Sequence, residues 1–103
     1  MKIFAVDFDG TLAIGEYGNK QVPNISLMGY LIQERKRGNK VILWTCRTGE
    51  HLEDAVRFCN EYGLEFDAVN ENLSEIIADY GGDTRKVFSD YYIDDRNLSP
   101  ALI

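Results

Sequence analysis

Four short apolar runs alternate with three amphipathic patterns along the chain. The runs cover residues 2–6, 41–44, 66–69 and 91–93 and are rich in β-branched and aromatic side chains. Their apolar character is nearly continuous rather than alternating, which is typical of strands covered on both faces. The pattern therefore predicts four buried strands of a parallel sheet.

Helical patterns separate these runs. Apolar residues recur at helical spacing over residues 25–35, 52–62 and 73–80. A glycine closes each pattern, at Gly38, Gly63 and Gly81. We expect Asn72 and Glu75 to cap the third helix as a pair. Alternating strands and helices predict right-handed crossovers and a single three-layer, Rossmann-like α/β domain with a short parallel sheet.

One segment interrupts the alternation. Residues 13–22, AIGEYGNKQV, contain two glycines and no helical stripe. They are expected to form a small β-hairpin or flap beside the end of the first strand. Glu16 and Tyr17 in this flap could touch a substrate, although a purely decorative loop is the simpler interpretation.

Composition narrows the class of protein. With 103 residues, the chain is predicted to be one domain over 1–103. Its formal charge of −6 disfavours non-specific nucleic-acid binding, because phosphate backbones are repelled at long range. No run reaches transmembrane length, and the first is too short for a signal-peptide core. With Cys46 and Cys59 interpreted as reduced thiols, we predict a cytoplasmic protein without a membrane segment.

Polar residues follow the apolar runs. In open parallel sheets, ligands bind beyond the carboxyl ends of the strands. The residues found there are Asp7 and Asp9, then Thr45, then Asn70, then Asp94 and Asp95. The sequence therefore predicts a site at this edge of the sheet.

The carboxylates of this set suggest a cation. Asp7 and Asp9 are two residues apart, so in an extended segment they point the same way, and Gly10 allows a tight turn after them. Asp94 and Asp95 leave the last strand at the same edge. Four carboxylates in one crevice are destabilising without a cation. Oxygen donors without a His or Cys cluster favour Mg²⁺.

Other groups of the set could hold an anion. The Thr45 hydroxyl, turn amides near Gly49 and the start of a helix form a nest of donors. Lys86 precedes the last strand and can bring an ammonium to the same edge. Arg47 either reaches the substrate phosphate or a second anionic group, or pairs with Glu50 at the surface, and the sequence leaves these alternatives open.

These residues carry a resemblance. DFDGTL at 7–12, Thr45, Lys86 and the acidic pair 94–95 together resemble the haloacid dehalogenase (HAD) superfamily of phosphohydrolases, in the right order and over nearly the whole chain. KVFSDYYIDD, at 86–95, is similar to short members of the sugar-linked or capsule-biosynthesis phosphatase type. Many members have the lysine further upstream, so Arg85 is a second candidate for its role. The gaps between motifs are too short for a cap domain, which implies a capless member.

The resemblance implies a role for each acidic residue. Asp7 would be the nucleophile that forms an aspartyl-phosphate. Asp9 would give a proton to the leaving oxygen and later take one from water. Mg²⁺ would be bound by Asp7, the backbone carbonyl of Asp9 and Asp94, with Asp95 acting through water or by orienting its neighbours. Asp9 is expected to hold the proton while Mg²⁺ and Lys86 keep the nucleophile ionised.

The resemblance also implies the partners of the site. Thr45 and Lys86, with Arg47 as a third candidate, would hold the phosphoryl oxygens of a small phosphomonoester such as a sugar phosphate or nucleotide. Many members continue with another helix and strand after the second acidic pair. The short sheet expected here leaves room for a homo-oligomer that covers it or closes the open site.

Two other functions remain open from the residues. A receiver-type signalling module also uses an acidic Mg²⁺ pocket with a Thr and a Lys. It would carry its phosphorylated Asp after the third strand, where this chain has Asn70, and adjacent acids after the first, where Phe8 intervenes. A metal-binding scaffold without turnover is the other alternative, although every expected catalytic position is filled.

Overall fold

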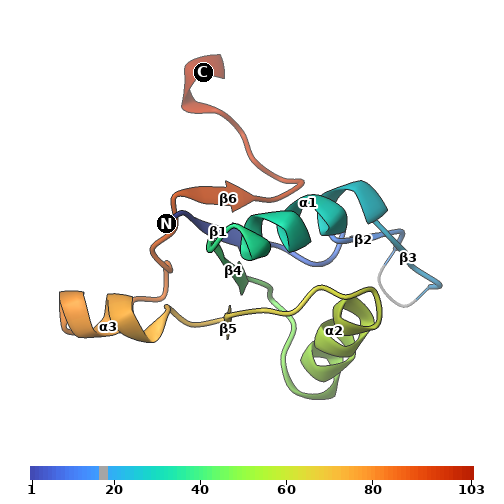
Figure 1. Cartoon of the computed structure of the whole chain (residues 1–103). Coiled ribbons are helices and arrows are strands. Elements are labelled where there is room, and N and C mark those ends of the chain that lie inside the picture. Colours follow the sequence, from blue (N-terminus) through green and yellow to red (C-terminus); the bar gives the residue numbers. More distant parts are fainter. Residues whose placement is uncertain (17–18) are drawn as a thin grey trace.

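A sheet of four parallel strands organises the chain, with helices on its two faces (Figure 1). The computed structural model describes residues 1–16 and 19–103, so Tyr17 lies outside the described residues. The elements, in order, are β1 (Ile3–Val6), β2 (Ala13–Ile14), β3 (Val22–Pro23), α1 (Ile25–Lys36), β4 (Lys40–Leu43), α2 (Gly49–Glu61), β5 (Ala68–Val69), α3 (Ser74–Tyr80), β6 (Tyr91–Ile93) and a 3₁₀ turn (Pro100–Leu102).

The order of strands in the sheet is β5-β4-β1-β6, and every pair is parallel. Val6, the last residue of β1, is level with Leu43 of β4 and Ile93 of β6, and Leu43 is level with Val69 of β5. Counted along the chain, the parallel strands lie in the order 3-2-1-4, so the winding direction reverses at β1. Such a switch point is where doubly wound sheets bind ligands. The predicted parallel α/β sheet is confirmed, but the prediction of four buried strands is wrong for its edges: β5 is half-buried, and Tyr91 and Tyr92 of β6 are exposed.

Successive side chains of β1 point to opposite faces of the sheet, and all four are buried. Phe4 and Val6 belong to a core cluster with residues of α1 and α2. Ile3 and Ala5 belong to a second cluster, which Ile76 of α3 joins from the other side. The three predicted layers are therefore present, and burial on both faces explains why the apolar run is continuous.

The predicted hairpin is formed by β2 and β3, which pair antiparallel. Its second strand leads into α1, where the Asn24 side chain caps the helix by accepting a hydrogen bond from Leu27 N. In Figure 1 the hairpin lies at the end of the sheet toward which β6 points. It is thus beside the carboxyl ends of the strands.

The predicted cap of the third helix is wrong. α3 begins at Ser74, and its N-cap, Leu73, makes no side-chain cap bond. Asn72 is instead 3% exposed; its amide donates to Asp83 Oδ1 at 2.8 Å and its Oδ1 accepts from Phe88 N at 2.7 Å. A buried amide needs partners for both of its ends. Here the tertiary structure offers them in the segment that leads to β6.

Two expectations from composition can be compared with the structure. Cys46 and Cys59 are both free thiols, the first exposed and the second buried. Within the described part of the chain, no helix is long and apolar enough to cross a membrane. Beyond β6, the last residues run away from the body of the domain (Figure 1).

Candidate functional site

The carboxyl ends of the strands meet at one place because of their register. Asp7 N donates to Ile93 O at 2.9 Å, and Trp44 N donates to Val6 O at 2.8 Å. The residues that follow β1, β4 and β6 are therefore neighbours. They border a cleft of about 690 Å³ whose lining includes Asp7, Asp9, Thr45, Arg47 and Asp94.

Three carboxylates lie close together here, and two of them, Asp7 and Asp94, line the cleft. Asp7, Asp94 and Asp95 each place one oxygen within 4.8 Å of the other two. Opposite ligands of an octahedral Mg²⁺ lie roughly 4.2 Å apart, and the ion prefers oxygen donors. The acidic triad therefore gathers the type of donor that a small divalent cation prefers. The fourth predicted carboxylate, Asp9, contacts Arg47 instead.

The Gly-Thr part of the DFDGTL motif makes room for the triad. Gly10 has φ +80, and a Cβ there would collide with the Asp95 carboxyl group, whose Cγ would be 2.9 Å away. Thr11 is 6% exposed, and its Oγ1 accepts a hydrogen bond from Asp95 N at 3.1 Å. The sequence analysis treated Gly10 only as a turn residue. Its second task, and the docking of Asp95 by Thr11, depend on a contact between residues far apart in the chain.

The proton affinity of Asp7 is raised. Its pKa is about 6, raised chiefly by burial and also by the charges of Asp94, Asp95 and Asp9, against a hydrogen bond from Phe8 N–H that lowers it. A cation among these carboxylates would act in the opposite direction and keep Asp7 ionised.

The pKa of Asp9 shifts in the opposite direction. A hydrogen bond from Arg47 lowers the pKa of Asp9, although burial raises it, and a hydrogen bond from Gln21 lowers it further. From the sequence, Asp9 is expected to hold the proton and Asp7 to be ionised. For the chain's own groups the order of the two pKa values is the reverse, because burial raises that of Asp7 and Arg47 lowers that of Asp9.

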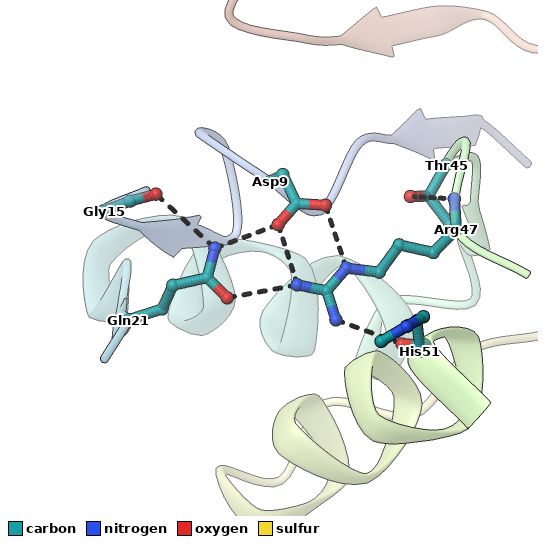
Figure 2. Close-up of polar contacts among 6 residues, drawn as sticks. All are labelled: Asp9, Gly15, Gln21, Thr45, Arg47 and His51. Atoms are coloured by element: carbon teal, nitrogen blue, oxygen red, sulfur yellow. Dashed lines mark hydrogen bonds and ion pairs between the residues drawn. The ribbon is translucent and has the colours of Figure 1, made fainter. Parts of the chain in front are cut away.

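Arg47 makes a forked contact with Asp9 (Figure 2). Its Nε donates to Asp9 Oδ2 at 2.9 Å and its Nη2 to Oδ1 at 2.8 Å. Gln21, which precedes β3, donates to the same Oδ1 at 2.9 Å. We call Asp9, Arg47 and Gln21 the Asp9 latch. From the sequence, the expected partners of Arg47 are the substrate phosphate, a second anionic group or Glu50, and Asp9 is not among them.

Thr45 sits in a loop that Asn70 holds in place. Asn70 Oδ1 accepts from Thr45 N at 2.8 Å, and Asn70 Nδ2 donates to Arg47 O at 3.4 Å. Asn70 itself has φ 54, a left-handed conformation that Asn tolerates better than most residues. The sequence placed Asn70 at this edge without a role. An Asn directly after a predicted strand was the available signal.

Lys86 reaches the site from its other side. It lines a smaller cleft of about 280 Å³, to which Asp7 and Asp94 also contribute. Its Nζ lies 5.4 Å from the centre of the Tyr92 ring. Arg85, the other candidate for the lysine role, pairs with Asp83 at 3.3 Å. The structure therefore brings Lys86 to the acidic triad and directs Arg85 elsewhere.

Comparison with known proteins gives one informative match. No family model and no curated protein matches the chain. A solved structure of a conserved protein from Bacteroides thetaiotaomicron superposes with a TM-score of 0.79 at 36% sequence identity, over 94% of this chain and 78% of the other. The two chains belong to one family. Because that relative is described only as a conserved protein, the function has to be argued from the site itself.

Proposed function

We propose that the protein is a Mg²⁺-dependent phosphatase with a HAD-like core and no cap domain, which hydrolyses a small phosphomonoester through an aspartyl-phosphate at Asp7. The observation that carries the proposal is the acidic triad beside Thr45 and Lys86, at the switch point of the sheet. A cation site next to a hydroxyl and an ammonium suits a phosphoryl group, whose oxygens are negative.

The triad is the proposed metal site. Asp7, Asp94 and Asp95 would hold the ion, together with the backbone carbonyl of Asp9. When bound, Mg²⁺ would neutralise charge on the phosphoryl oxygens and on the carboxylates around it. The remaining steps belong to the chain's own residues.

Asp7 would act as the nucleophile. One carboxylate oxygen attacks phosphorus while the bond from phosphorus to the leaving oxygen breaks. Asp9 gives its proton to that oxygen, and the alcohol departs. A water molecule then attacks the phosphorus, Asp9 takes its proton, and the release of phosphate restores the Asp7 carboxylate.

The protonation states change during this cycle. At rest the Arg47 fork holds Asp9 ionised, which suits its second task as a base. The first task requires a proton on Asp9. A phosphoryl dianion bound beside the carboxylate favours that protonation, because like charges at close range disfavour the ionised form.

Thr45 and Lys86 would hold the phosphoryl oxygens. The Thr45 Oγ1 accepts a hydrogen bond from Arg47 N at 3.2 Å, so its own proton is available to donate. The loop around it is positioned by Asn70, so the donor is oriented before substrate binds. Such preorganisation is the main source of electrostatic stabilisation in enzyme sites.

The cleft favours a small substrate. Its volume of about 690 Å³ lies in the range of small-molecule sites, roughly 300–1,000 Å³. Trp44 and Arg96 line it together with the acidic residues and could face the leaving group. A sugar phosphate or a nucleotide is therefore the substrate class that we propose.

Strand order argues against a receiver-type signalling module. CheY-like receivers use the order 2-1-3-4-5, in which the third strand lies next to the first. Here the third parallel strand, β5, lies outside β4, and β6 occupies the place beside β1. Asn70, which follows β5, has no carboxylate to be phosphorylated. The phosphatase hypothesis is therefore favoured over a receiver-type module.

Mg²⁺-dependent phosphate release from sugar phosphates, nucleotides and 4-nitrophenyl phosphate tests the proposal. Asp7→Asn is expected to lose on the order of 10³-fold or more in kcat, because the nucleophile is removed. Asp54→Asn, at an exposed carboxylate that pairs with Arg57, is the matched control and should stay near wild type. Absence of release by folded, Mg²⁺-loaded wild-type protein on every substrate would refute it. Much faster release from a phosphorylated DNA end would refute the substrate class alone.

A further inference from the structure

We infer that Arg47 and Gln21 are positioning residues for Asp9 and that Arg47 is not a ligand of the phosphoryl group. The inference rests on the proposed function, in which Asp9 moves the proton. It assigns the Asp9 latch a task in catalysis and couples the β2–β3 hairpin to it.

Both oxygens of Asp9 are fixed by the latch. Arg47 donates one hydrogen bond to each oxygen, and the Gln21 amide adds a third bond to Oδ1. Two parallel bonds between a guanidinium and a carboxylate fix the plane of the carboxylate as well as its position. A proton-transfer group needs that control, because an error of about 1 Å can cost on the order of 10²-fold in rate.

Arg47 is itself held on several sides. Its Nη2 also donates to Gln21 Oε1 at 3.1 Å and its Nη1 to His51 O at 3.0 Å. The guanidinium carbon lies 4.6 Å from the centre of the Phe8 ring, and the side chain is only 11% exposed. Binding a phosphoryl group would require it to give up Asp9, which would leave that carboxylate without its cation. The surroundings therefore keep Arg47 on Asp9.

Gln21 brings the hairpin into the latch. Its amide group uses both ends, because Nε2 donates to Asp9 and Oε1 accepts from Arg47. The same Nε2 lies 3.5 Å from the Gly15 carbonyl, next to β2 (Figure 2). Asp9 and Gln21 are 12 residues apart, so this contact fixes the hairpin against the loop that carries the proposed nucleophile.

Lys86 is better placed to bind phosphate than Arg47. Within residues 1–16 and 19–103, Lys86 forms no ion pair, and its Nζ lies over the Tyr92 ring beside the cleft that Asp7 lines. Lys86 and Arg47, two cationic side chains of the site, thus have different roles. Lys86 faces the phosphoryl group, and Arg47 serves the proton-transfer residue.

Leaving-group dependence separates the two roles of Arg47. We would compare kcat/KM for an alkyl phosphate, whose leaving oxygen needs a proton, with that for 4-nitrophenyl phosphate, whose leaving oxygen hardly does. Arg47→Lys and Gln21→Ala are expected to lose about 30-fold and about 5-fold on the alkyl ester, and less than about 3-fold on the nitrophenyl ester. Inhibition by inorganic phosphate should change less than about 2-fold. Arg57→Lys and Gln33→Ala, at exposed sites, are the matched controls.

Amide hydrogen exchange of β2 and β3 provides a readout that needs no turnover. Both latch variants should exchange these amides at least about 5-fold faster than wild type, whereas the controls should not. Equal losses on the two esters with weaker phosphate inhibition would overturn the inference, since Arg47 would then bind phosphate. Unchanged kinetics and exchange would overturn it too. If the wild-type protein releases no phosphate, the proposed function fails, and the catalytic task of the latch fails with it. The exchange rates then report separately whether the latch holds the hairpin.

Discussion

The cleft contains two acidic regions that are built in opposite ways. Asp9 carries its own counter-charge, because Arg47 forms a forked ion pair with it, and its pKa is lowered. The triad of Asp7, Asp94 and Asp95 brings three carboxylates together, and burial with mutual repulsion raises the pKa of Asp7 to about 6. The ionised form of a carboxylate is thus stabilised at Asp9 and destabilised at Asp7.

The contrast shows where the chain fixes a charge and where it leaves a place for one. A guanidinium stays charged at every accessible pH and holds a carboxylate in one plane, so it suits a side chain that must keep its orientation. Three carboxylates without such a partner are unfavourable until a cation joins them. We therefore expect the carboxylates of the triad, and not the Asp9 carboxylate, to bind divalent ions.

Gly10→Ala should have the largest effect on stability, because Gly10 directly follows Asp9 and lies against Asp95 of the triad. The change adds strain at φ +80 and drives a Cβ into the Asp95 carboxyl group. We expect the free energy of unfolding to fall by about 3 kcal/mol, and the stabilisation by Mg²⁺ to be lost as Asp95 moves away. Urea unfolding with and without Mg²⁺ measures both.

Gly81→Ala is the control for this change. Gly81 has a similar φ of +76, but a Cβ there would meet nothing within 4 Å. It should cost only the backbone strain, about 1 kcal/mol, and leave the response to Mg²⁺ intact. Equal costs at Gly10 and Gly81 would show that the approach of Asp95 is unimportant.

Asp9→Asn should have the next largest effect. It removes the charge of the carboxylate that pairs with the nearly buried Arg47 guanidinium, and we expect a loss of about 2 kcal/mol in unfolding free energy. Asp54→Asn removes the partner of Arg57, whose side chain is 63% exposed, and should cost less than about 0.5 kcal/mol. Adding Arg47→Met to Asp9→Asn should recover part of the loss. If Asp9→Asn and Asp54→Asn lower the unfolding free energy by the same amount, the ion pair between Asp9 and Arg47 is not coupled as described.

Asp7→Asn should have the smallest effect, and one of opposite sign. Without divalent ions at pH 8, it should raise the unfolding free energy by about 1 kcal/mol, a value discounted for partial exposure. The folded pKa of about 6 lies above the ordinary 3.8, so Asp7 favours folding below pH 3.8 and loses this contribution as pH rises through 6. The gain in the variant should therefore vanish near pH 4.

Without divalent ions at pH 8, Asp7→Asn should be more stable than wild type. At saturating Mg²⁺, wild type should be the more stable of the two. The wild-type triad would bind the ion and gain stability by mass action, about 2.7 kcal/mol at 100 times Kd, whereas Asp7→Asn lacks one ligand. Chemical unfolding between pH 4 and pH 8, in EDTA and in Mg²⁺, tests the whole pattern. A variant less stable than wild type in EDTA at pH 8 would contradict the repulsion assigned to the triad.

Several contacts of the site were beyond sequence analysis for a common reason. Arg47 and Asp9 are 38 residues apart, and Thr11 and Asp95 are 84 apart, so no local pattern signals either contact. Asn72 carried a local capping signal, yet its partners Asp83 and Phe88, 11 and 16 residues away, decided the role of this buried side chain. In each case a side chain was assigned its partner by burial and register.

The alternation of strands and helices, the hairpin and the edge at which Asp7, Thr45 and Asp94 meet can all be predicted from the sequence. This is possible because periodicity sets each element, and parallel strands bring their carboxyl ends to one side. Only the folded domain shows that Arg47 pairs with Asp9 and not with a carboxylate of the triad. That choice depends on which side chains the folded backbone brings within hydrogen-bonding distance, a property of the packed domain that no single segment contains.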